Sequence, residues 1–432
     1  KYHYFYMLSY NFFLIKSSPL RKIPIRTMLF IWGIVYLDMY DVALYIGYSI
    51  YLSPVILPHL ALYSVFLIFS SIFVASQFSK IIGYFWFNLL EDSYSQKNAT
   101  RAPRLIGLCY LILALQPTYY DIGIYAFYLF LLIRMIQGFA FGFELAFVVR
   151  FANAQGQQKS RRFMFYFIVF AGEIGILVSV FVNRLIISQG WDISLYDYIC
   201  RLQFFTGFCL IFLHYIFIER KISLRVYSNR FTRLNFLYSL KKDGLYILFR
   251  SSILCFNVVL IIMIIFRMPN LSHLGMGWSH QLINQTVLRI TILSFLGSSF
   301  VRLIEQKFRP NNMMLFFYLL GIVVCLIWIY FNLVYTQYRL WLYIIAFLYG
   351  VFIRLYPLVM YQLADFNSHN RLSNRYLGAF LSYNLFGSIT LFALDMAHYC
   401  VHSYHDNIAL YILIISAAIG IISLQLYTKK FK

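Results

Sequence analysis

Apolar runs of about 20 residues recur along the whole chain and constrain its fold more than any other feature. An α-helix needs a run of that length to cross the hydrocarbon core of a bilayer. The composition agrees, because 62% of the 432 residues are hydrophobic and only 12% are charged. Soluble domains are about 45–50% apolar and about 25% charged, so this chain has too few charges to cover its apolar surface in water. The sequence therefore predicts an all-α, polytopic membrane protein.

Hydropathy and polar breaks divide the chain into twelve predicted membrane-spanning helices. The first six are expected at residues 27–50, 60–87, 105–115, 122–149, 163–187 and 199–218, the third being cut short by Pro117. The second six are expected at residues 245–266, 282–303, 313–333, 340–362, 376–397 and 408–427. We therefore expect an N-terminal six-helix half at 1–219, a basic cytoplasmic linker at 220–244 and a C-terminal six-helix half at 245–432. Two six-helix halves with a solute site between them are typical of secondary transporters.

The basic residues are distributed unevenly between the two sides of this predicted topology. The formal net charge is +21, and most lysines and arginines fall in the loops that lie on one side when both termini are cytoplasmic. That bias follows the positive-inside rule, so the charge indicates topology and does not indicate a nucleic-acid partner. We expect a multi-pass protein of the cell inner (plasma) membrane, monomeric, with lipid, protons and a small solute as partners.

Enzyme and cofactor motifs are missing from the sequence. No phosphate-binding glycine loop, nucleophile elbow or zinc-protease motif is present. The six cysteines mostly lie inside apolar runs and show no paired metal-ligand spacing. His398, His402 and His405 have a spacing that can bind a metal, but they fall in a predicted outer loop, where histidines are commonly just exposed. We expect no cofactor, no metal and no enzymatic activity.

The predicted fourth helix carries charges that need partners. Arg134, Gln137 and Glu144 interrupt the apolar run at residues 131–150. An arginine in the middle of such a run costs roughly 2.5–3.5 kcal/mol on insertion scales. Gly138 and Gly142 form a small-xxx-small face that lets a neighbouring helix approach closely. The pattern is equally consistent with a functional site and with a packing seam that holds one structural ion pair.

The predicted first helix supplies carboxylates at a similar depth. Asp38 and Asp41 are three residues apart and so share one face of the helix. At 1.5 Å per residue, both aspartates and Arg134 lie about midway through the membrane, and Arg134 is expected to pair with one of the two. Two carboxylates this close in a low dielectric cannot both ionise cheaply, which makes them a candidate proton carrier. The alternative is a pair that faces a water-filled cavity for solvation alone.

Three further charged residues inside predicted helices are candidate site residues. Glu173 is near mid-depth in the fifth helix, where it is a candidate proton or substrate group. Arg289 and Arg354 place cations in the second half, where a carboxylate solute bound between the halves would need them. Long arginine side chains can also extend to a helix end and stabilise it, so a structural role remains the alternative for Arg289 and Arg354.

Three motifs resemble the metabolite:proton symporters of the major facilitator superfamily, which include carriers for proline and betaine, 2-oxoglutarate, citrate and shikimate. In the first helix the matching residues are Asp38, Met39, Tyr40, Asp41, Leu44 and Tyr45. In the fourth helix they are Arg134, Gln137, Gly138, Gly142 and Glu144, and in the eleventh they are the run from Gly378 to Tyr383, Asn384 and Gly387. The resemblance implies the major facilitator fold and alternating access, with Asp41 and Arg134 in proton coupling and a solute cavity between the halves.

We thus expect proton coupling at Asp38, Asp41, Arg134, Glu144 and Glu173, and solute contacts from Tyr45, Gln137, Arg289, Arg354, Tyr383 and Asn384. The cytoplasmic loop signature of the superfamily is eroded. Its remnants are Gly83, Asp92, Arg101 and Arg104, but the tight glycines and the adjacent Asp-Arg pair are missing. The leading hypothesis is a symporter of a small carboxylate-bearing or zwitterionic metabolite. The alternatives are a degenerate carrier that binds without transport and a membrane-embedded glycan polymerase or processing enzyme, although the short outer loops argue against the latter.

Overall fold

The computed structural model describes residues 25–58, 62–89, 92–154, 158–187, 196–217 and 287–297, residue 285, and scattered positions from 384 to 422. Within these ranges the structure is helical and contains no strand. The helices are α2 (Ile25–Ile56), α3 (Leu62–Leu89), α4 (Asp92–Leu115), α5 (Tyr119–Ile122), α6 (Tyr125–Ala154), α7 (Gln158–Ile187) and α8 (Tyr196–Phe217). The predicted linker at 220–244 and the predicted helices at 245–266, 313–333 and 340–362 lie outside the described residues.

The six long helices occur where the first six spans are predicted, with one clear difference at the third. That helix was expected at residues 105–115, but α4 begins at Asp92 and continues through Pro103. Its 24 residues give a length of about 36 Å at 1.5 Å per residue. Hydropathy missed the first turns because they are polar, and polar helical turns are stable where a helix leaves the bilayer. Asp92, Arg101 and Arg104, expected in a loop, therefore lie on a helix.

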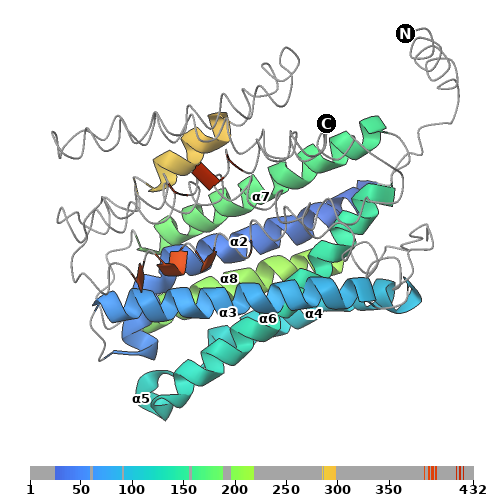
Figure 1. The fold of residues 1–432 in the computed structure, drawn as a ribbon. Helices are drawn as coiled ribbons and strands as arrows, with labels where there is room; N and C mark the ends of the chain where they lie inside the picture. The colour runs from blue at the N-terminus through green and yellow to red at the C-terminus, as the bar shows by residue number, and fades with distance from the viewer. Residues whose placement is uncertain are drawn as a thin grey trace, which may run out of the picture.

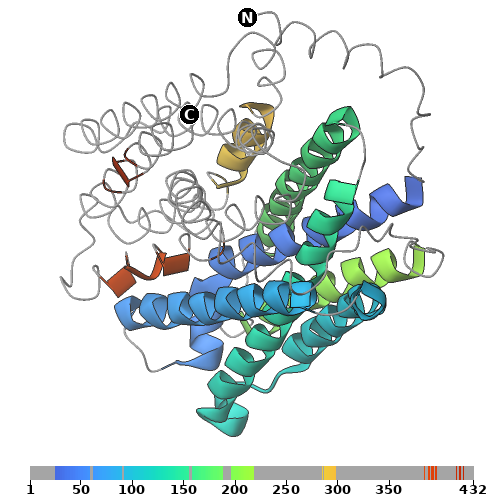
Figure 2. The ribbon, with the colours of Figure 1, turned by 45° about the vertical axis from the view of Figure 1, so that its right-hand side comes forward.

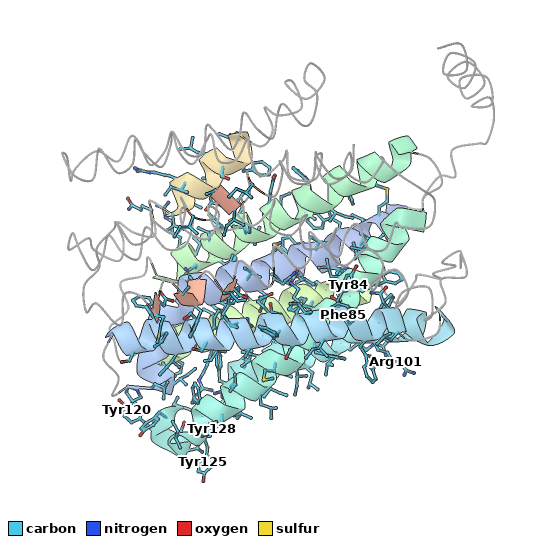
Figure 3. The ribbon with its side chains drawn as sticks, in the orientation of Figure 1. Tyr84, Phe85, Arg101, Tyr120, Tyr125 and Tyr128 are labelled. Atoms are coloured by element: carbon cyan, nitrogen blue, oxygen red, sulfur yellow. The ribbon has the colours of Figure 1, made fainter. Side chains whose placement is uncertain are left out.

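Three described helices contain stretches that are long and apolar enough to cross a bilayer, at Met28–Tyr45, Ser64–Leu89 and Tyr125–Val149. The long helices lie side by side in one bundle (Figure 1). Exposed Tyr120, Tyr125 and Tyr128 gather at one end, and Arg101 lies at the other (Figure 3). Tyrosines are typical of the membrane–water interface, so the end that carries them is suited to one membrane surface.

Helix α2 lies at the centre of the described bundle, packed against α7 and α8 and also touching α3 and α6. Its close approach to α7 depends on Gly175, because a Cβ there would overlap the carbonyl oxygen of Tyr36. The helix Val287–Gly297 lies beside α7, where Phe295 packs on Phe170 with ring centroids 5.7 Å apart (Figure 2). The central place of α2 puts both of its aspartates inside the protein.

Helices α3 and α6 interlock through three glycines. A Cβ on Gly138 or Gly142 would overlap the carbonyl oxygens of Ser76 and Lys80, and a Cβ on Gly83 would overlap the carbonyl of Phe139. Backbones that approach this closely gain van der Waals contact that larger side chains would prevent. The seam fixes the position of Lys80 on α3 relative to the residues of α6.

We expect Gly142→Ala to lower the thermal stability of the purified protein, by an amount in the range of about 1–3 kcal/mol that is typical of overpacking. The added methyl meets the rigid backbone of Lys80. Gly172→Ala is the matched control, because its methyl meets the flexible side chain of Met39, at 2.9 Å from Cγ. Thermal unfolding in detergent, followed by size-exclusion chromatography, measures both. Equal stability of the two variants would contradict the role of the seam.

Candidate functional site

Two acidic and two basic side chains meet in the interior of the described bundle. Asp38 and Asp41 come from α2, Lys80 comes from α3 and Arg134 comes from α6. Their exposed fractions are 3%, 5%, 2% and 1%, respectively. Their formal charges cancel, so the cluster is neutral when all four groups are ionised.

Arg134 binds Asp41 through two parallel hydrogen bonds. Its Nη1 donates to Oδ1 at 2.8 Å, and its Nη2 donates to Oδ2 at 2.9 Å. This bidentate geometry is the strongest arrangement open to an arginine and a carboxylate. Of the two partners left open by the sequence, the structure selects Asp41.

Neighbouring polar groups complete the shell of this ion pair. The Tyr110 hydroxyl donates to Asp41 Oδ1 at 2.9 Å, and Gln137 Nε2 donates to the same oxygen at 3.1 Å. Gln137 also accepts from Arg134 Nη1 at 2.8 Å. Tyr110, on α4, is a site residue that the sequence analysis missed; it lies inside an apolar run with no charge beside it.

The ring of Tyr45 covers the guanidinium, with its centroid 4.7 Å from Arg134 Cζ. The Tyr45 hydroxyl donates to the carbonyl of Phe69 at 2.7 Å, which fixes the ring in place. Such a cation–π contact is worth about 2 kcal/mol or more when it is desolvated. Arg134 Nε is buried and has no hydrogen-bond partner among the described residues. The arginine thus holds Asp41 while it retains one unused donor.

Lys80 forms the second ion pair, with Asp38. Its Nζ lies 2.6 Å from Oδ1 and 2.7 Å from Oδ2. The sequence analysis placed Lys80 inside a membrane segment without giving it a role. A signal was present, because a lysine inside the apolar run of α3 needs a buried partner as much as Arg134 does.

The remaining predicted site residues are placed as follows. Glu144 on α6 and Glu173 on α7 are buried, with exposed fractions of 1% and 9%. Asn384 is buried, and its carbonyl accepts a hydrogen bond from Ser388 at 2.6 Å. Arg289, on the helix Val287–Gly297, is exposed. Arg354 and Tyr383 lie outside the described residues.

A polar chain beside the cluster ties α2 to α8 and α7. The hydroxyls of Tyr40 and Thr206 are 2.8 Å apart, Thr206 donates to the carbonyl of Gln203, and Gln203 donates to Asn183 at 3.0 Å. Because the Thr206 hydrogen is used on Gln203, Tyr40 acts as the donor to Thr206. These residues orient α2 against α8 and α7.

We expect Arg134→Gln to destabilise the protein strongly, by about 3–5 kcal/mol, because it leaves the buried Asp41 carboxylate without its cation. The double variant Arg134→Gln/Asp41→Asn removes both charges and should recover much of that loss. Thermal unfolding of the wild type, both single variants and the double variant gives the coupling energy. Purely additive losses would show that the two side chains do not interact in the folded protein.

The described fold matches solved structures of membrane transporters. A D-xylose-proton symporter matches with a TM-score of 0.73 and 15% identity, over 94% of this chain and 97% of that one. The transporter FucP in its outward conformation matches with a TM-score of 0.64 and 14% identity, over 94% and 98%. A transporter of the POT family, in complex with a thioalcohol-conjugated peptide, matches with a TM-score of 0.67 and 11% identity, over 94% and 97%.

No protein-family model matches the sequence, and no curated protein matches it. The structural matches nevertheless extend over nearly the whole length of both chains at TM-scores well above 0.5. FucP is described as a major facilitator superfamily transporter. These findings confirm the fold class predicted from the sequence: the chain is an all-α, multi-pass membrane protein with the major facilitator fold.

Proposed function

We propose that the protein is a proton-coupled symporter of the major facilitator superfamily that moves a small solute by alternating access. Its fold supports this, since the solved structures that it resembles include xylose and fucose symporters driven by protons. The observation that carries the proposal is the buried, bidentate Asp41–Arg134 pair. Ionisable residues at this depth are rare because they are costly to bury, and where they occur they usually mark a solute or proton pathway.

Coupling follows from the competition for Arg134. A proton on Asp41 neutralises the carboxylate and weakens both hydrogen bonds from the guanidinium. Arg134 is then free to bind an acceptor on the solute, for which Nε already has an unused donor. A proton and a solute that each favour the same rearrangement shift the balance between inward- and outward-open states together.

The charge balance of the cluster favours a carboxylate-bearing or zwitterionic solute. The four charges cancel, so one bound proton leaves a net positive charge in a low dielectric, and an anionic group on the solute would offset it. We propose Tyr45 and Gln137 as solute contacts from the N-terminal half, and Arg289, Arg354, Tyr383 and Asn384 from the C-terminal half. Glu144 and Glu173 are further proton-binding candidates. We place the protein in the plasma membrane as a monomer, with both termini cytoplasmic.

A sugar is the second candidate solute. The observation that favours it is the presence of D-xylose and fucose symporters among the structural matches. Sugars carry no charge, so a sugar would leave the positive charge of a protonated cluster without an offsetting anion. This physical difference makes the two classes separable by experiment.

We expect reconstituted protein to accumulate a labelled carboxylate solute when an inward proton gradient is imposed. One pH unit stores about 1.4 kcal/mol per proton, which supports about tenfold accumulation. Asp41→Asn should reduce accumulation to the level reached without a gradient, and Arg134→Lys should reduce uptake because lysine cannot make the bidentate contact. The assay is uptake of proline, betaine, 2-oxoglutarate, citrate, xylose and fucose into proteoliposomes.

Asp121→Asn is the matched control for the Asp41 variant, since Asp121 is an exposed aspartate outside the cluster. It should accumulate solute as the wild type does. Intact gradient-driven accumulation in Asp41→Asn would refute the coupling role of Asp41. Solute binding without any uptake would instead support a degenerate carrier.

A further inference from the structure

The two buried ion pairs are adjacent but chemically different. Asp38 and Asp41 are separated by about one helical turn of α2, and each is bound by its own cation from a different helix. Asp41 accepts four hydrogen bonds, two from Arg134, one from Tyr110 and one from Gln137. Asp38 accepts two, both from the Nζ of Lys80. Asp41 is thus held by three residues from two helices, whereas Asp38 is held by one residue.

The cations of the two ion pairs also differ in how rigidly they hold their carboxylates. An arginine does not lose its proton in a protein, and its planar fork is rigid. A lysine is a point charge on a flexible stem with three rotatable donors. Lys80 is 2% exposed. An Asp–Lys pair can therefore bind and release a proton with a small movement of the lysine, whereas an Asp–Arg pair must break a bidentate contact.

Other ionisable groups lie on the helices around α2. The buried ones are Glu144 and Arg134 on α6, Glu173 on α7 and His214 on α8. His214 lies against Phe30, with its Nε2 at 3.2 Å from the carbonyl oxygen of that residue, two turns of α2 away from Asp38. Among the described residues, Lys80 provides the cation that contacts Asp38 directly.

We propose that the Asp38–Lys80 pair is a second proton-binding site, separate from Asp41. A proton from water forms an O–H bond on the Asp38 carboxylate, and no other covalent bond changes. Lys80 stays an ammonium ion, so the cluster gains one positive charge while Asp41 and Arg134 remain paired. The inference rests on the proposed transport function for its physiological meaning, but proton binding at Asp38 can be measured without any solute.

The test is infrared difference spectroscopy of the full-length protein in lipid, recorded as the pH is changed. A protonated, buried carboxylic acid gives a carbonyl band that a carboxylate lacks. We expect one band to be lost in Asp38→Asn and retained in Asp41→Asn. In Lys80→Met the midpoint of that band should move to higher pH by roughly 1–3 units, because the carboxylate loses its cation. Lys80→Arg, which keeps a cation at this position, should retain the band.

The double variant Asp38→Asn/Lys80→Met removes both charges and replaces the single variants in the test if either of them does not fold. It should also lack the band. The inference would be overturned if every band of the wild type survived in Asp38→Asn, or if no band responded to the change at Lys80. These outcomes are independent of transport. Gradient-driven uptake without an Asp38 band would refute only the second site, and an Asp38 band without any uptake would refute only the transport proposal.

Discussion

The bidentate contact between Arg134 and Asp41 is the interaction on which the interior of the described bundle depends. A guanidinium that is 1% exposed has no water to solvate it, so its stability comes from protein groups alone. The carboxylate supplies charge, Gln137 supplies an acceptor and the ring of Tyr45 supplies a polarisable face. These groups come from α2 and α6, so the ion pair determines how those helices sit against each other.

The glycine seam between α3 and α6 is what brings the second cation into the same site. Gly142 lies against the carbonyl of Lys80, so the backbone of α3 approaches α6 more closely than a residue with a Cβ at position 142 would allow. The side chain of Lys80 then extends to α2 and meets Asp38. A larger residue at 142 would push α3 away and separate Lys80 from its partner. Backbone packing and buried charge are thus parts of one arrangement.

The sequence carried enough information for the fold class and for one of the two ion pairs. Apolar run length and charge placement predicted the helices, and the depth argument brought Arg134 to the level of Asp38 and Asp41. It could not decide between the two aspartates, because depth does not report which face of α6 points at which turn of α2. Tyr110 had no signal at all, since a tyrosine in an apolar run looks like any other aromatic residue. Lys80 did carry a signal, because a lysine inside an apolar run needs a buried partner.

Four charges that cancel in pairs are stable as they stand, and this balance underlies the coupling role that we propose for the cluster. A structural role alone would be met equally well by apolar residues, since buried ion pairs often contribute no net stability over well-packed hydrophobic side chains. Adding one proton to either aspartate breaks the balance and leaves an uncompensated cation in a low dielectric. That imbalance is relieved when an anionic group enters or when the cluster opens to water. A proton and a solute that relieve each other's electrostatic cost bind cooperatively, and cooperative binding is the thermodynamic basis of symport.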